Sequence, residues 1–203
     1  DKEDLKDKLK EDIACFYVEN PNYYGLLEDI IDLGNIVHEN GSKYVIGCNP
    51  ISLGLITSPS EANADIAVGE GQSLGIPLSF GGPYFGFMAC KRELMRKLPG
   101  RIVGQTTDTK GQRGFVLTLQ AREQHIRREK ASSSICSNQS LCALTGAMYL
   151  AYVGPVGLNE VAKRCFDLAH YAFDQIIKID GFTPKYEGEF FHEFVIKTPI
   201  HVD

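Results

Sequence analysis

A glycine-dense stretch between two short apolar segments constrains this chain more than any other feature of its sequence. Ile66–Val68 leads into the stretch, Phe85–Cys90 follows it, and five glycines lie between Gly69 and Gly82. Glycine tolerates positive φ and lets another backbone or a ligand come close, so such density is typical of a tight, shaped loop. The stretch therefore predicts a strand, a long functional loop and a second strand.

Two phosphate-binding motifs do not fit this loop. The glycines of Gly69–Gly75 nearly match the dinucleotide fingerprint. Their last spacing is one residue too long, however, and Pro77 and Gly81 leave no helix to receive a pyrophosphate. Gly81 to Gly86 has the glycine spacing of a Walker loop but lacks the Lys-Ser or Lys-Thr that follows. On spacing alone, a glycine-rich crossover packed between domains remains an alternative.

The chain before the loop has the pattern of a parallel sheet. Ala14–Val18 and Tyr44–Cys48 are continuous apolar runs, which are typical of strands covered on both faces, and Leu26–His38 between them keeps a helical period. This order predicts a βαβ unit with a right-handed crossover. Asp65–Val68 follows as a third strand. The short, turn-rich connection to Tyr84–Ala89 predicts that the fourth strand runs antiparallel.

The ends and the middle of the chain give weaker patterns. Asp1–Asp12 suits a short amphipathic helix, and Lys91–Lys97 suits another. The polar, turn-rich segment Ile102–Gly114 predicts a hairpin tip at Asp108–Gly111, followed by a short strand over Phe115–Leu119.

Two helices are predicted further on, separated by a breaker. Leu141–Tyr152 is apolar nearly all round, which predicts a buried helix, and Gly154–Gly157 interrupts it. Leu158–Ile179 has one apolar stripe, as a long amphipathic helix has. Glu193–Lys197 then reads as a strand.

Composition excludes several classes of protein. The net charge of −5 and a pI near 5.6 argue against a nucleic-acid partner. The six cysteines form no C-x-x-C pair and read as reduced thiols. No wholly apolar run approaches the roughly 20 residues that a membrane span needs, so we expect no membrane partner. Together these features predict a cytoplasmic protein.

Three blocks of the sequence carry a family resemblance. They are Ala64–Ala89, Thr118–Lys130 and Ser134–Gln139. Over about Val18 to Ala162 the chain resembles the P-proteins of the glycine cleavage system, and within them the α chains of the two-chain glycine decarboxylases. The resemblance implies the fold-type-I architecture of pyridoxal-phosphate enzymes. This is an α/β, three-layer αβα large domain with a mainly parallel sheet and one antiparallel strand.

The resemblance also implies domain boundaries. Residues 1–155 would be part of the PLP-transferase-like large domain, 156–180 a connecting helix, and 181–203 the start of a small C-terminal domain. Family members run to several hundred residues, so we expect this chain to be a fragment truncated at both ends.

Two positions decide whether pyridoxal phosphate could work in this chain. A lysine must form the imine with the cofactor, and an acid beside the pyridine nitrogen must keep it protonated. Aligned with the family on Ile76-Pro77 and Gly81-Gly82, the lysine position falls on Gln72, an amide that forms no Schiff base. The acid position falls on Ile46. We therefore expect no catalytic, cofactor-binding or metal-binding residue here.

Other titratable residues have ordinary explanations. Lys91 stands where an exposed helix would start, and Asp65 and Glu70 lie five residues apart across a strand end, which favours local solvation or capping. His125 and His192 lack the spacing of metal ligands.

The resemblance implies an α subunit that binds no cofactor itself. A sister P-protein β subunit would hold pyridoxal phosphate, and the pair would decarboxylate glycine and transfer the aminomethyl group to the lipoyl group of H-protein. Gly69–Gly86 and Arg122–Asn138 are the candidates for shaping the partner's cavity. The alternatives are a self-sufficient pyridoxal-phosphate aminotransferase or lyase of the same fold, and an interaction module without an enzyme partner. Exposed sheet edges predict that the fragment self-associates.

Overall fold

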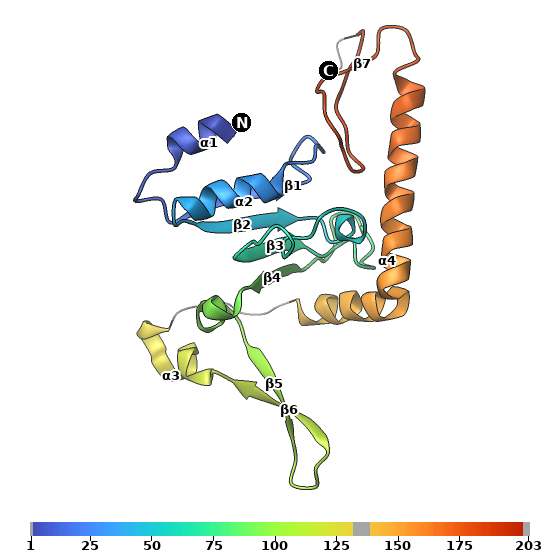
Figure 1. Ribbon diagram of the computed structural model, residues 1–203. Helices are drawn as coiled ribbons and strands as arrows, with labels where there is room; N and C mark the ends of the chain where they lie inside the picture. Colours follow the sequence, from blue (N-terminus) through green and yellow to red (C-terminus); the bar gives the residue numbers. More distant parts are fainter. Residues whose placement is uncertain (1, 132–138, 201–203) are drawn as a thin grey trace. The chain divides into compact units, whose positions relative to one another are not determined.

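The computed structural model describes residues 2–131 and 139–200, which form two compact units (Figure 1). One unit comprises Asp1–Ala89 with Leu141–Asp203, and the other comprises Cys90–Ser140. This division rests on which residues pack together. The boundaries expected at residues 155 and 180 follow the family's domains instead, and they stay a prediction.

A four-stranded mixed sheet forms the centre of the first unit. Its strands lie in the order β1 (Cys15–Asn20), β2 (Lys43–Cys48), β3 (Ile66–Glu70) and β4 (Gly86–Cys90). β1, β2 and β3 are parallel. β4 is reversed, because Gly71 N–H donates to the Phe85 carbonyl while Gly69 faces Phe87. The predicted βαβ unit and the antiparallel fourth strand are both confirmed.

One face of the sheet is covered by α1 (Lys2–Lys8) and α2 (Ile30–Glu39). Asp29 caps α2 by accepting a hydrogen bond from Asp32 N–H at 3.3 Å, and the Tyr44 hydroxyl donates to the Ile30 carbonyl at 2.9 Å. Each aliphatic side chain buried here contributes roughly 1.5–3 kcal/mol. The core between helices and sheet consists of Leu5, Ile30, Leu33, Val37, Tyr44, Ile46, Cys48 and Ala62.

The first strand is not covered on both faces, contrary to the prediction from its apolar run. Cys15 is exposed and 54% of the Tyr17 surface is accessible. In this sheet β1 is an edge strand, whereas Tyr44 and Ile46 on the inner strand β2 are buried as expected.

The two predicted helices form a single bent element, α4 (Ser140–Ile176). Gly154 has φ 61° and ψ −175°, and Pro155 follows, so the predicted break lies inside α4. Downstream of the bend, Ala162 is fully buried against Ile51 and Phe191. A second core cluster forms here from Ile51, Leu74, Ile76, Phe85, Ala162 and Phe191.

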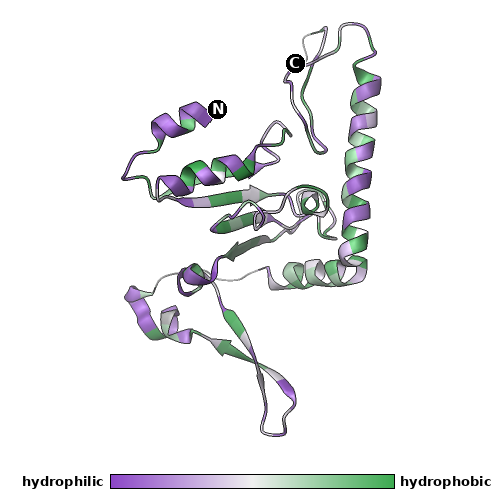
Figure 2. Cartoon of the chain, in the orientation of Figure 1, coloured by the Kyte–Doolittle hydropathy of each residue, from purple (hydrophilic) through white to green (hydrophobic). Residues whose placement is uncertain are grey.

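The prediction that the upstream part of α4 is buried is wrong for this chain. Leu141, Met148 and Tyr152 are 75%, 65% and 91% exposed, and Figure 2 shows mostly apolar colours along this stretch. Apolar residues all round a helix indicate that its surface is buried in the complete protein. The pattern does not show which residues bury that surface, or whether they lie within these 203 residues.

By length and composition α4 is apolar enough to cross a membrane, which the sequence reading did not anticipate. The part of α4 after Gly154 is too charged to span a membrane by itself, because any 18 consecutive residues of it include Glu160, Lys163, Arg164 and Asp167. The apolar stretch of α4 that is long enough to cross a membrane therefore includes the bend at Gly154. One helix of this kind is weak support for a span, because helices of soluble proteins pass the same test.

The second unit is built on a hairpin. β5 (Ile102–Thr107) and β6 (Arg113–Thr118) pair antiparallel, and the Asp108 carboxylate accepts from Lys110 N–H and Gln112 N–H at 2.8 Å. The predicted hairpin tip and the following strand are confirmed, but half of the segment expected to be turn is β5. The short helical elements of this unit are η2 (Arg92–Lys97), η3 (Gln120–Arg122), α3 (Gln124–Arg127) and η4 (Arg128–Lys130).

Two further short elements belong to the first unit. η1 (Ser52–Gly54) follows β2, and β7 (Thr183–Pro184) pairs antiparallel with β8 (Ile196–Lys197). β8 coincides with the end of the strand expected over Glu193–Lys197.

Candidate functional site

A pocket of about 520 Å³ lies where β1, β2 and β3 end. Ligands of open α/β sheets bind outside the carboxyl ends of the parallel strands, so this pocket is the candidate site. It is lined by Tyr17, Glu19, Pro21, Asn22, Tyr23, Gly47, Cys48, Asn49, Val68, Gly69, Glu70, Gln72, Ser73, His192 and Glu193.

Gln72, the residue aligned to the lysine position, lines this pocket. Its backbone N–H donates to a Glu70 carboxylate oxygen at 2.6 Å, and its side-chain Nε2 donates to the Ile76 carbonyl at 2.6 Å. The amide thus braces the beginning of the glycine-rich loop. It offers neither a nucleophilic amine nor a titratable proton.

Ile46 does not line the pocket. Only 1% of its surface is accessible, and it packs in the core beneath α2 with Leu33 and Val37. Its neighbour Gly47 faces the pocket, and a Cβ at Gly47 would overlap the hydroxyl end of Tyr17. The structure therefore brings only one of the two predicted positions to the site.

Aromatic and amide side chains complete the pocket wall and were not predicted. Tyr17 comes from β1, Tyr23 and Asn22 from the turn after it, and His192 from the segment before β8. The pKa of the Tyr17 phenol is raised, mainly by burial and to a smaller extent by the negative charge of Glu19. The sequence offered one signal for such residues, which is their position just after a predicted strand. Asn22 and Tyr23 follow β1 in this way, and Asn49 follows β2.

The charge of the pocket is negative. Glu19, Glu70 and Glu193 line it, and none of its lining residues is a lysine or an arginine. His192 Nδ1 is buried without a hydrogen-bond partner among the residues described. Across the ranges 2–131 and 139–200, no group of three or more His, Cys, Asp or Glu side chains could hold a metal ion.

These residues do not fit pyridoxal phosphate. The cofactor needs an amine for its imine and positively charged or N–H donors for its phosphate. The pocket presents an amide where the amine is needed, and three carboxylates would repel a phosphate group.

The other candidate residues lie elsewhere. Lys91 precedes η2 in the second unit and lines no part of the pocket. Asp65 is 2% exposed and is held by Tyr44 N–H at 2.8 Å and His38 Nε2 at 2.9 Å, so it fixes the start of β3 rather than pairing with Glu70.

Two segments were expected to shape a partner's cavity. The loop Gly69–Gly86 is fixed at its base, because Leu74, Ile76 and Phe85 belong to the core cluster with α4. The segment Arg122–Asn138 starts in the second unit, where Glu123 and His125 line a separate pocket of about 330 Å³. Its part 132–138, with Cys136 and most of the block Ser134–Gln139, lies outside the described residues.

The five described cysteines are free thiols. They are Cys15, Cys48, Cys90, Cys142 and Cys165.

Comparison with known structures supports the fold. A crystal structure of the glycine decarboxylase (P-protein) of the glycine cleavage system, in inhibitor-bound form, matches with a TM-score of 0.90 and 48% identity. It covers 94% of this chain and 44% of that one. The sphingosine-1-phosphate lyase of Burkholderia pseudomallei matches with a TM-score of 0.59 at 16% identity over 93% of this chain and 41% of its own, which shows a shared fold only.

Sequence relatives point to the same family. The probable glycine dehydrogenase (decarboxylating) subunit 1 of Desulfitobacterium hafniense is 50% identical over 200 residues, which are 98% of this chain and 45% of the relative. Its counterpart from Moorella thermoacetica is 52% identical over 200 residues, with the same coverage. The chain thus spans less than half the length of these curated relatives. The family model of the glycine cleavage system P-protein matches residues 1–201. On this agreement of sequence and fold, the chain belongs to the glycine cleavage system P-protein family.

Proposed function

We propose that this chain is part of the α subunit, subunit 1, of a glycine dehydrogenase (decarboxylating). In this proposal the whole enzyme decarboxylates glycine and transfers the aminomethyl group to the lipoyl group of H-protein. The names of the relatives, each a probable subunit 1, support an assembly with a second subunit. The enzyme would work in the cytoplasm.

The observation that carries the proposal is the chemistry of the strand-end pocket. Gln72 stands at the lysine position with its Nε2 already bonded to a backbone carbonyl, and three carboxylates face the same space. A pocket of this kind favours an α subunit that leaves cofactor binding to its partner. Pyridoxal phosphate would be held by the P-protein β subunit.

The proposal extends to the architecture of the whole subunit. In the described chain, α1 and α2 cover one face of the sheet, whereas Tyr17 on the opposite face is exposed. A three-layer αβα fold of the type-I class would cover that second face with helices from the remainder of the protein.

Reconstitution of the full-length subunits tests the proposal. We expect the full-length α subunit alone to yield no borohydride-trapped pyridoxyl adduct and no exchange of glycine's carboxyl carbon with labelled bicarbonate. Co-expression with the β subunit, with lipoylated H-protein present, should restore exchange, with the adduct mapped to the β subunit. An adduct on a lysine of the α subunit alone would instead establish a self-sufficient enzyme.

A further inference from the structure

The tip of the glycine-rich loop, Leu78–Gly82, has an unusual backbone. Ser79 and Phe80 both have positive φ, at 44° and 55°, and Gly81 N–H donates to the Leu78 carbonyl at 3.0 Å. Positive φ at both central residues is the requirement of a type I′ turn, which Asn-Gly or Gly-Gly normally satisfies. A serine and a bulky aromatic residue are unfavourable there. The tip therefore stores backbone strain.

The chain around the tip gains no packing from this conformation. The Phe80 side chain is fully exposed, and Leu78 and Tyr84 are 76% and 59% exposed. A strained backbone that places an aromatic side chain in solvent indicates a role outside the described part of the chain.

The base of the loop is fixed, so the tip is held in place. Leu74 and Ile76 on one side and Phe85 on the other are buried against α4 and Phe191. The Gln72 side chain adds a hydrogen bond to the Ile76 carbonyl. The loop thus presents Phe80 from a rigid support, which limits the entropy lost on binding.

The composition of the loop defines the surface that would receive it. Residues 73–89 include no Asp, Glu, Lys, Arg or His. Charged residues are depleted and aromatic residues enriched in the cores of protein interfaces, where a few buried aromatics carry most of the binding energy. An uncharged tip with exposed Leu78, Phe80 and Tyr84 suits an apolar pocket of a protein partner.

We propose that Phe80 is an anchor residue that inserts into an apolar pocket of subunit 2. This inference rests on the proposed function, because the partner is the second subunit that the relatives' names imply. The loop leads directly from Gln72 and Ser73, which line the strand-end pocket, so the anchor fixes that pocket's wall relative to the partner.

Binding of full-length subunit 1 variants to purified subunit 2 tests the anchor. Phe80→Ala should raise the dissociation constant at least tenfold while leaving the melting temperature of free subunit 1 unchanged. The matched control is Phe115→Ala, which removes a 63% exposed aromatic from β6 in the other unit. It should change binding by less than twofold. Hydroxyl-radical footprinting should label Phe80 in free subunit 1 and show protection once subunit 2 is added.

Three results would overturn the proposal, and they are distinguishable. Binding of Phe80→Ala within twofold of wild type removes the anchor but leaves the proposed function intact. Protection of Phe80 in free full-length subunit 1 would mean that the rest of the same chain covers it. Failure of wild-type subunit 1 to bind subunit 2 at all would contradict the proposed function and the anchor with it.

Discussion

At the scale of single residues, Gly69 in β3 shows how tightly the sheet is packed below the loop. A Cβ at this position would overlap the Phe87 ring and the backbone carbonyl of Cys48. Because the carbonyl belongs to the neighbouring strand, it cannot swing aside as a flexible side chain would. Gly69→Ala is therefore expected to lower the free energy of unfolding by about 1–3 kcal/mol.

Urea denaturation of the variant measures this loss. Gly86→Ala on the next strand is the matched control, since its Cβ would meet only the Gly69 carbonyl at 3.7 Å, an ordinary contact. Equal stability of Gly69→Ala and Gly86→Ala would contradict the described packing of β4 on β3.

Cys48 at the end of β2 makes the free energy of unfolding depend on pH in the alkaline range. Burial raises the pKa of its thiol from 9.0 to about 11. The folded protein then holds this proton more tightly than the unfolded chain. The contribution to stability is complete below pH 9 and is lost as pH rises through about 11. Burial also raises the pKa of the Tyr44 phenol, which adds to the loss above pH 10.

Urea midpoints measured between pH 7 and pH 11 check this dependence. The decline above pH 9 should be shallower in Cys48→Ala than in wild type. It should be unchanged in Cys15→Ala, whose thiol is exposed. Parallel curves for wild type and Cys48→Ala would refute the role of the buried thiol.

The two aligned site positions show what residue-level reasoning could and could not find. Gln72, in the loop after β3, lines the pocket. In β2, however, the aligned position Ile46 is one residue away from the position that faces the pocket. Successive side chains point to opposite faces, so Gly47 reaches the pocket while Ile46 enters the core.

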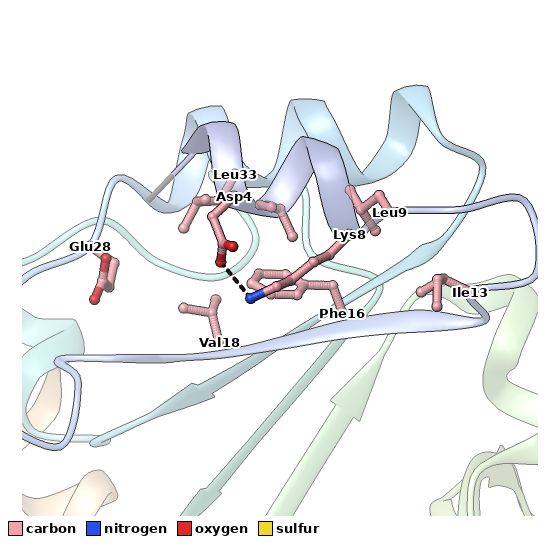
Figure 3. A pocket seen from close by; sticks show the side chains of 9 residues that line it. Asp4, Lys8, Leu9, Ile13, Phe16, Val18, Glu28 and Leu33 are labelled. Atoms are coloured by element: carbon pink, nitrogen blue, oxygen red, sulfur yellow. Dashed lines mark hydrogen bonds and ion pairs between the residues drawn. The ribbon is translucent and has the colours of Figure 1, made fainter.

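At the scale of elements, α1 is attached by few contacts. Leu5 is its only buried residue, and a cavity of about 460 Å³ remains beneath the helix, lined among others by Leu9, Phe16 and Val18 (Figure 3). Leu5→Ala should cost about 2 kcal/mol and release α1 locally without unfolding the sheet.

Hydrogen exchange separates the two kinds of attachment that hold α1. In Leu5→Ala the amides of α1 should lose protection while those of β2 keep it. Lys2→Ala breaks exposed ion pairs with Asp29 and Asp32, each 2.6 Å long, and should change exchange much less. Equal loss of protection in both variants would contradict this expectation, because it would mean that the ion pairs hold the helix as strongly as Leu5 does.

Element types were largely predictable, whereas their burial was not. Gly154 and Pro155 identified the bend in α4, because helix breakers act locally. The exposure of Leu141 and Met148 depends on neighbours that no local pattern contains. The same applies to β1, whose apolar run looked buried although it forms a sheet edge.

At the scale of the whole molecule, the sheet of the described chain has two open edges. β1 and β4 are its outer strands, and an unpaired edge offers N–H and C=O groups to another chain. The 203-residue chain should therefore self-associate, with light scattering showing a molecular mass that rises with concentration. A constant mass of 22.5 kDa at high concentration would contradict this expectation.

Family membership followed from sequence blocks, but the division into units did not. The unit Cys90–Ser140 is an excursion between β4 and α4 whose ends both join the other unit. Such a division depends on long-range packing. A scan along the chain places boundaries at breakers such as Gly154 and Gly181 instead.

The uncharged loop has a consequence for how the protein is made in the cell. Copies of a surface that bears no charge do not repel one another, and here that surface runs from Ser73 to Ala89 and ends in the outer strand β4. In the proposed assembly, copies of the chain made in excess of subunit 2 would leave this surface uncovered and free to associate with itself.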